Sequence, residues 1–152
     1  MIVTIRPEPP RQEGVIRLLD MSDAYAASLY PAESNHLLDI SSLEKETVTF
    51  LVARRGETVL GCASLVEALD GTAEIKRMFV DPEARGLKLG RRLLEELEAV
   101  ASRKGIKRVR LETGIYQPEA LGLYRAFGYR EIGPFGSYKP DPLSVFMEKV
   151  LG

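Results

Sequence analysis

One stretch of the sequence combines glycine and basic residues in a pattern that suits a phosphate ligand. The range Arg85–Gly90 reads RGLKLG, follows an apolar segment that ends at Pro82, and precedes a long amphipathic pattern. A helix that begins here would offer unpaired main-chain N–H groups and a partial positive charge to an anion. Gly86 and Gly90 would let the main chain approach that anion closely. Residues 74–92 also carry a local charge of +3 in a chain whose net charge is -1.

Other kinds of loop share parts of this pattern. The stretch is not a P-loop, because Gly-x-x-x-x-Gly-Lys-Ser/Thr is absent, and it is not a Rossmann turn, because Gly-x-Gly-x-x-Gly is absent. A surface loop with solvated charges, whose glycines serve only the turn, remains an alternative at this point.

The elements that would position this loop change type along the chain. Short β-branched or alternating runs predict strands over Ile2–Arg6, Val48–Ala53, Thr58–Ala68, Thr72–Val80, Arg108–Glu112, Tyr129–Ile132 and Ser144–Val150. Helical spacing of apolar residues predicts helices over Arg11–Leu29, Leu37–Lys45, Leu87–Lys104 and Pro118–Phe127. The order is β-α-α-β-β-β-α-β-α-β-β. It predicts an α/β (α+β) fold with a mixed, mostly antiparallel sheet of about seven strands flanked by helices.

Composition and length limit the classes of protein to which this chain can belong. A chain of 152 residues with 45% apolar content predicts a single domain over residues 1–152, and it excludes disorder of the whole chain. The net charge of -1 disfavours a nucleic-acid partner. We expect neither a membrane span nor a signal peptide, which makes the cytoplasm the default location. With Cys62 as the one cysteine and His36 as the one histidine, neither a disulfide within the chain nor the usual His/Cys metal site is expected.

Two segments at a fixed separation resemble the signatures of the GCN5-related N-acetyltransferase (GNAT) family. The family's acetyl-CoA loop reads Arg/Gln-x-x-Gly-x-Gly/Ala, and Arg85–Gly90 matches it at both ends. Residues 120–129, ALGLYRAFGY, resemble the second signature, Ala-x-x-Leu-Tyr-x-x-x-Gly-Phe/Tyr, and Glu74–Pro82 looks like the family's fourth strand. Lys88 departs from the pattern, because it stands where the family usually has its middle glycine. Lysine disfavours a positive φ, so a helical φ at this position is the conformation that would tolerate it.

The resemblance implies a reaction and a cofactor site. An acetyl group would pass from acetyl-CoA, a co-substrate used without a metal, to an amine by direct attack in a ternary complex. The pyrophosphate would lie on the main chain of the loop, and the pantetheine arm would pair with the open edge of the fourth strand. The expected cofactor-binding residues are Met78, Phe79, Val80, Arg85, Gly86, Leu87, Lys88, Leu89, Gly90, Arg91 and Gln117.

The same resemblance implies two catalytic residues. Tyr124 would be the general acid for the leaving thiolate, although its place on an apolar helical stripe is also typical of a core residue. Glu74 would be the base for the ammonium group, directly or through water. A surface carboxylate paired with Lys76 is the alternative for Glu74, and His36 is a second candidate for an auxiliary base.

Two loops, Tyr30–Leu38 and Pro134–Leu143, would frame the acceptor in this fold. Their polar residues Ser34, Asn35, His36 and Tyr138 are the expected substrate-binding residues. For Ser34, Asn35 and His36, a role in the loop and in helix capping is the alternative. A small-molecule amine is the expected acceptor. A protein or peptide N-terminal acetyltransferase and a non-catalytic acyl-CoA-binding or sensing domain are the alternatives. Because the family often forms dimers through its last strands, a homodimer through Ser144–Val150 stays open.

Overall fold

A single sheet forms the middle layer of the computed structural model, which describes residues 2–152. Its strands are β1 (Val3–Pro7), β2 (Val48–Arg55), β3 (Thr58–Glu67), β4 (Thr72–Val80), β5 (Arg108–Gly114), β6 (Arg130–Ile132) and β7 (Ser144–Val150). They lie in the order β1-β2-β3-β4-β5-β7-β6, and the pairing is antiparallel everywhere except between β4 and β5. The mixed, mostly antiparallel sheet of the predicted α/β fold is therefore confirmed.

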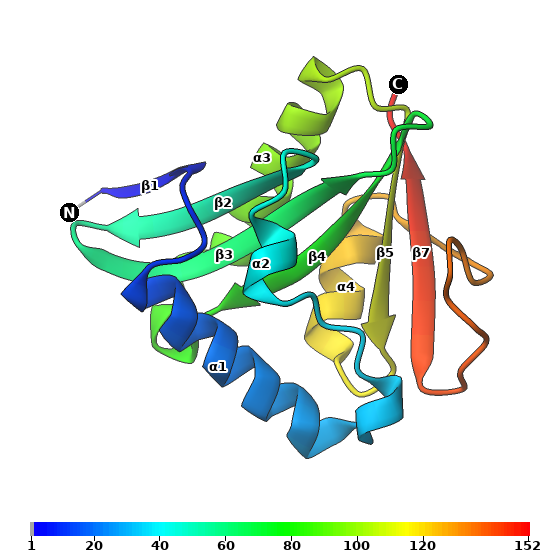
Figure 1. Ribbon diagram of the computed structural model, residues 1–152, viewed down its shortest axis with the longest axis horizontal. Helices are drawn as coiled ribbons and strands as arrows, with labels where there is room; N and C mark the ends of the chain where they lie inside the picture. Colours follow the sequence, from blue (N-terminus) through cyan, green and yellow to red (C-terminus); the bar gives the residue numbers. More distant parts are fainter. Residues whose placement is uncertain (1) are drawn as a thin grey trace.

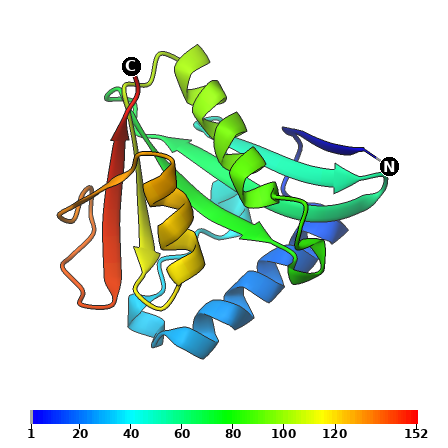
Figure 2. The same cartoon turned by 180° about the vertical axis from the view of Figure 1, so that it is seen from behind.

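Helices cover both faces of this sheet. The helices are α1 (Glu13–Leu29), α2 (Ile40–Leu43), α3 (Leu89–Arg103) and α4 (Pro118–Ala126), with short 3-10 turns at Ala32–Ser34 and Pro82–Ala84. Figure 1 shows α1 and α2 in front of the sheet, and Figure 2 shows α3 and α4 on its other face. Within residues 2–152, no helix combines the length and the apolar character needed to cross a bilayer.

Two hydrophobic clusters join the layers. The larger one packs the buried leucines of α3, with Leu93 and Leu97 fully buried, against the sheet face that also meets α4. The smaller one packs α1 through Val15 and Leu18 against the opposite face, where Cys62 is buried. Burial raises the pKa of the Cys62 thiol to about 12. This cysteine is thus a small, protonated core residue.

Each of the four predicted helices differs from the structure at one end or both, by one to three residues, and local features explain two of these differences. The helix expected from Leu87 starts at Leu89, because the residue before it has the left-handed conformation that no helix continues. The helix expected over Leu37–Lys45 is confined to Ile40–Leu43. Its first turn is capped by Asp39, whose side-chain carboxylate accepts a hydrogen bond from the Ser42 N–H at 2.8 Å.

Candidate functional site

The two parallel strands in the middle of the sheet separate at their carboxyl ends. Pairing between β4 and β5 stops at Ile75 and Leu111, yet β4 continues along β3 to Val80 and β5 continues along β7 to Gly114. Figure 1 shows the two strands diverging from this last contact. The edge of β4 from residue 76 onwards therefore lacks a neighbouring strand, and its main-chain groups are open to a ligand.

The glycine-bearing loop lies directly after the open end of β4. Asp81 caps the turn Pro82–Ala84 by accepting a hydrogen bond from the Glu83 N–H at 3.0 Å, and Gly86 has a φ of +88°. Lys88 precedes α3 with φ +56° and ψ +38°, which is a left-handed conformation and not the helical one that would suit a lysine. The first N–H groups of α3 have no partner within the helix, so they are free to donate hydrogen bonds to a phosphate, as the sequence predicted.

Side chains around this loop leave the main chain accessible. Arg85, Lys88 and Arg91 are exposed, while Leu89 is buried and anchors the first turn of α3. A Cβ at Gly90 would come within 3.3 Å of the Leu123 side chain of α4. Glycine at this position therefore lets α3 and α4 pack closely beside the loop.

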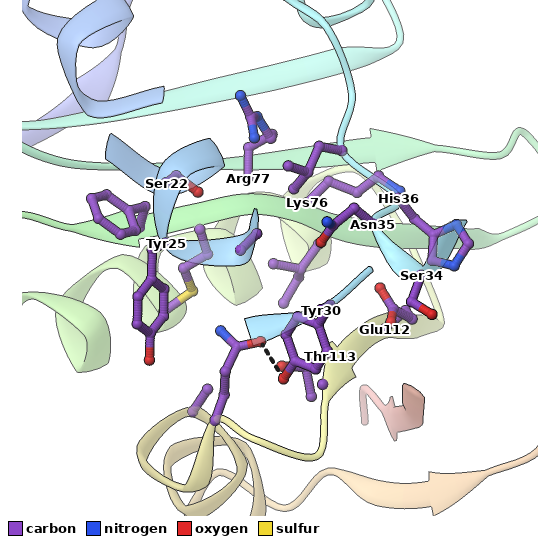
Figure 3. A pocket seen from close by; sticks show the side chains of 18 of the residues that line it. Ser22, Tyr25, Tyr30, Ser34, Asn35, His36, Lys76, Arg77, Glu112 and Thr113 are labelled. Carbon is purple, nitrogen blue, oxygen red and sulfur yellow. Dashed lines mark hydrogen bonds between the residues drawn. The ribbon is translucent and has the colours of Figure 1, made fainter. Parts of the chain in front are cut away.

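A cleft of about 160 Å³ opens where β4 and β5 diverge (Figure 3). Its walls come from the C-terminal half of α1, the loop before α2, both strands, the start of α4 and the loop before β7. The structure brings nine predicted site residues into this lining: Ser34, Asn35, His36, Glu74, Met78, Phe79, Gln117, Tyr124 and Tyr138. Within the described chain, Val80 and Arg85–Arg91 are not part of the lining, because they lie at and beyond the end of β4.

Tyr124 lies on the α4 side of the cleft. Its hydroxyl is 3.7 Å from the Met78 sulfur, and 7% of its surface is exposed. Burial raises the pKa of this phenol to about 12. The hydroxyl is therefore a neutral donor at physiological pH, which is the protonation state that a general acid needs. Its ring also packs in the larger cluster, so it serves the core as well.

Glu74 is held by two neighbours on the opposite side of the cleft. Its carboxylate accepts a hydrogen bond from the Tyr138 hydroxyl at 2.5 Å and lies 3.5 Å from the Lys76 ammonium. Lys76 also donates to the Tyr138 oxygen at 2.6 Å. Burial and the nearby carboxylate raise the pKa of Tyr138 above its ordinary range. The pair with Lys76 that the sequence left as an alternative is thus present.

Glu112 is a second carboxyl in the cleft, and reasoning from the sequence missed it. It lies near the end of β5 and accepts a hydrogen bond from the Ser144 hydroxyl at 2.8 Å. Burial is the largest influence on this group and raises its pKa from 4.5 to about 7. Its position at the carboxyl end of a parallel strand beside a divergence was the available signal, because functional groups collect there.

The two loops that frame the acceptor side touch each other across the sheet. The Ser34 hydroxyl donates to the Asp141 carboxylate at 2.7 Å, and the rings of His36 and Tyr138 meet edge to face with centroids 5.1 Å apart. We call these two contacts the bridge between the acceptor loops. A second groove, of about 840 Å³, lies beyond this bridge and shares five lining residues with the cleft: His36, Leu37, Glu74, Lys76 and Tyr138. These shared residues form the wall between the two cavities.

Tyr30 closes the cleft at the α1 end. Its hydroxyl accepts a hydrogen bond from the Tyr116 N–H at 3.0 Å and lies 3.3 Å from the Gln117 side-chain oxygen, to which it donates (Figure 3). A Cβ at Gly114 would lie 1.8 Å from the Tyr30 oxygen, so only glycine fits there. Tyr30 thus ties the end of α1 to the segment between β5 and α4.

Comparisons with known proteins agree with this geometry. The model of the acetyltransferase (GNAT) family matches residues 15–129. A protein named IAA acetyltransferase from Azospirillum brasilense is 52% identical over 150 residues, which are 98% of each chain. A crystal structure from Klebsiella pneumoniae, provisionally assigned as an acyl-CoA N-acyltransferase, is 39% identical with a TM-score of 0.87 over 99% of both chains. The PaiA N-acetyltransferase of Thermoplasma acidophilum, solved with coenzyme A, shares the fold at a TM-score of 0.76 and 23% identity, over 99% of this chain and 100% of that one.

Proposed function

Because this chain belongs to the acetyltransferase (GNAT) family, we propose that it transfers an acetyl group from acetyl-CoA to the amine of a small molecule. The amine attacks the thioester directly in a ternary complex. The observation that carries this proposal is the divergence of β4 and β5, which places a neutral phenol and a carboxyl group with a pKa of about 7 in one cleft.

The cofactor end of the site is suited to acetyl-CoA, which supplies the thioester. The N–H groups at the start of α3 and the exposed side chains of Lys88 and Arg91 would hold the pyrophosphate. Asp81 donates its N–H to Leu60 on β3 at 2.8 Å, and main-chain directions alternate along a strand. The N–H groups of Val80 and Met78 therefore point away from β3, where they would pair with the pantetheine arm.

Glu112 is the base in this proposal. An amine that arrives as an ammonium ion must lose a proton before it attacks, and a carboxylate with a pKa of about 7 can accept that proton near neutral pH. The Glu74 carboxylate already accepts a hydrogen bond from the Tyr138 hydroxyl and forms an ion pair with Lys76. We assign it to the wall of the acceptor site, and we keep it as the alternative base that a pH profile distinguishes.

Tyr124 is the acid. As the new C–N bond forms and the C–S bond breaks, the electron pair of the C–S bond goes to sulfur, and the phenol supplies the proton to it. The proton that the nitrogen loses on acylation then restores the phenol through solvent. The raised pKa keeps that proton on Tyr124 until the thiolate develops. The side chains of Cys62 and of the buried serine Ser64 face main-chain carbonyl groups of β4, so neither is placed as a nucleophile for an acyl-enzyme.

The bridge between the acceptor loops favours a small acceptor over a peptide chain. A chain that runs between the two loops would have to break the Ser34–Asp141 hydrogen bond and part His36 from Tyr138. The cleft inside the bridge has about 160 Å³, comparable to a cavity of about 150 Å³ that holds benzene. The IAA that gives the Azospirillum relative its name is therefore one compound to test as acceptor, beside primary amines of similar size.

Two measurements test this function. Acetyl-CoA is expected to raise the midpoint of thermal unfolding, because it binds the folded state alone. Release of free thiol from acetyl-CoA is then measured with IAA, a panel of small primary amines, and short peptides with a free N-terminus. Stabilisation with turnover on small amines supports the proposal. Turnover on peptides alone would indicate a peptide N-terminal acetyltransferase. Stabilisation by acetyl-CoA without turnover would indicate a non-catalytic acyl-CoA sensor. If acetyl-CoA does not stabilise the protein, all three functions are refuted.

A further inference from the structure

The second acceptor loop, Pro134–Leu143, ends in a turn that three hydrogen bonds fix in place. The Asp141 carboxylate accepts the Leu143 N–H at 2.8 Å, and the Asp141 carbonyl accepts the Ser144 N–H at 3.0 Å. The Leu143 carbonyl accepts the N–H of Ile115, just after β5, at 3.0 Å. This turn is therefore held both by its own residues and by the end of β5.

Ser144 brings the turn into contact with Glu112. Ser144 is the first residue of β7, and Glu112 of β5 pairs with Phe146, two residues further along. Residues two apart on a strand share a face, so the side chains of Ser144 and Glu112 are diagonal neighbours on that face. The Ser144 hydroxyl donates to Oε2 of Glu112 at 2.8 Å. This bond fixes the rotation of a carboxyl group that lines the cleft.

The first acceptor loop is joined to the same turn. The Ser34 hydroxyl donates to Oδ2 of Asp141 at 2.7 Å, while the Leu143 N–H donates to Oδ1. The Leu143 N–H and the Ser34 hydroxyl, in that order, hold the pKa of Asp141 below its ordinary value, so it is a carboxylate at neutral pH. Ser34 and Glu112 both line the cleft (Figure 3). Hydrogen bonds therefore connect the loop before α2 with Glu112 through the turn.

Ser144 differs in its effect from the charged groups around Glu112. Titratable groups on three elements face this carboxyl: Glu74 and Lys76 of β4, Tyr30 at the end of α1, and Tyr138 and Asp141 of the second acceptor loop. Burial raises the pKa of Glu112 most, and the two nearby carboxylates add to this rise. The Ser144 hydroxyl and the Lys76 ammonium lower the pKa, because both favour the ionised form. A hydrogen bond depends on direction as well as distance, so the effect of Ser144 follows the shape of the turn.

We propose that Ser144 is a positioning residue for Glu112, and that the hydrogen bond between Ser34 and Asp141 makes this positioning depend on the bridge between the acceptor loops. The proposal rests on the proposed function, in which Glu112 accepts the proton of the amine. With the bridge intact, the Ser144 hydroxyl points at Glu112 and holds its carboxylate for the ammonium group. When the bridge opens, Asp141 loses the contact from Ser34, and the hydrogen bond to Glu112 weakens. The loops that admit the acceptor thus also set the base that acts on it.

The first test follows the pH profile of kcat/KM in the wild type, Ser144→Ala and Ser144→Thr. Acetyl-CoA and a reactive small primary amine are the substrates. Loss of a hydrogen bond to the ionised carboxyl should move the rising limb of Ser144→Ala about one pH unit higher, and lower kcat/KM about tenfold at pH values below the limb. Ser144→Thr keeps a hydroxyl on a residue favoured in strands, and it should restore the wild-type profile.

A second measurement reports the pKa of Glu112 without turnover. The contribution of this group to the free energy of unfolding falls with rising pH until its folded-state pKa is passed, and is constant above it. Unfolding midpoints of each variant are compared across pH with those of the same variant carrying Glu112→Gln, which cancels the contributions of other groups. In Ser144→Ala the fall should extend about one pH unit higher than in the wild type.

Ser34→Ala tests the dependence on the bridge. It should move the limb in the same direction as Ser144→Ala but by less. The double variant should shift no further than Ser144→Ala alone, because Ser34 acts through Ser144. Ser28→Ala is the matched control. The Ser28 hydroxyl donates to the Tyr25 carbonyl within α1 at 2.6 Å, and Ser28 is exposed, so its removal should leave the limb in place.

The two measurements separate failure of this inference from failure of its premise. If Ser144→Ala moves neither the limb nor the unfolding profile, Ser144 does not position Glu112. If Ser34→Ala changes KM and leaves the limb in place, or if the shifts of the single variants add, the bridge is not coupled to the base. If Ser144→Ala moves the unfolding profile but not the limb, Glu112 is not the base, and this part of the proposed function is overturned instead.

Discussion

The proposed acetyl-CoA site comes from one continuous stretch of chain, residues 78–91, whereas the proposed acceptor site is assembled from α1, two loops, β4, β5 and α4. The first presents mainly main-chain N–H groups and glycines. The second presents side chains, among them Glu74, Glu112, Tyr124 and Tyr138. A main-chain site depends on the local conformation of a few residues. A side-chain site depends on contacts between residues that are far apart in the sequence.

This difference predicts how each end responds to substitution. Removing a side chain at the acceptor end removes the reacting group itself, so turnover should fall steeply. Removing a side chain at the acetyl-CoA end leaves the main-chain donors in place, so binding should weaken only a little. The expected effects therefore decrease from Glu112 to Lys88, and a reversal of this order would show that the two ends do not differ in this way.

The largest effect is expected for Glu112→Gln. Loss of the base should lower kcat/KM by roughly 10²–10³-fold. Because the pKa of Glu112 is about 7, the wild-type rate should rise as the pH increases through about 7, and this limb should disappear in the variant. Glu74→Gln is the control and should keep the limb. If Glu74→Gln removes the limb and Glu112→Gln retains it, Glu74 is the base.

Glu112 should also make stability depend on pH. Its pKa rises on folding from 4.5 to about 7, so between these values the folded state holds a proton that the unfolded state has lost. The free energy of unfolding therefore falls as the pH rises from 4.5 to about 7. Glu112→Gln removes this contribution. Unfolding midpoints measured across that range should decrease less steeply with pH in the variant, and equal slopes would argue against the raised pKa.

Tyr124→Phe is expected to have the next largest effect. Without the phenol proton the thiolate leaves more slowly, and turnover should fall by about 10²-fold while acetyl-CoA affinity stays within about twofold. Tyr129→Phe is the matched control, because its ring meets that of Tyr124 edge to face and its hydroxyl donates to Glu98 at 3.0 Å, outside the cleft lining. The control should lose about 1–2 kcal/mol of stability and keep its turnover. Unchanged turnover in Tyr124→Phe would make this tyrosine a core residue only.

Tyr138→Ala should change which acceptors react. The Tyr138 ring lies in the wall between the cleft and the larger groove, so its removal should join the two cavities. Relative kcat/KM for long over short primary amines should rise about tenfold, the scale on which a pocket discriminates a methylene group or two. Tyr138→Phe keeps the ring while losing the hydrogen bonds to Glu74 and Lys76, and it should preserve the wild-type preference. Equal preferences in the Ala and Phe variants would show that the ring does not limit the acceptor.

The two ends also differ in how far the sequence predicted them. The loop at Arg85–Gly90 and the stripe around Tyr124 were visible because helix starts, glycines and apolar spacing are local patterns. Glu112 was missed because its pKa depends on burial by distant segments, with Ser144 as its partner. The left-handed conformation of Arg77, with a φ of +54°, was missed for the same kind of reason, since Asp23 of α1 binds its side chain and Cys62 of β3 binds its carbonyl group.

Lys88 stands out in the sequence, yet its conformation could not be predicted from it. Its substitution gives the smallest expected effect. The sequence identified it as a departure from the glycine pattern, and its φ of +56° places a lysine where glycine would be unstrained. Both Lys88→Ala and Lys88→Gly lose a charge near the phosphates, so each should weaken acetyl-CoA binding by about two- to fivefold.

The comparison between these two variants separates charge from backbone. Glycine adopts the left-handed conformation freely and alanine does not, so Lys88→Gly should be about 1 kcal/mol more stable than Lys88→Ala in urea unfolding. If the two variants bind acetyl-CoA equally but differ in stability, the loop holds its shape in both, and only the cost of that shape has changed. If Lys88→Gly instead binds more weakly than Lys88→Ala, the strained lysine holds the loop ready for the phosphates, and this end of the cleft depends on a side chain after all.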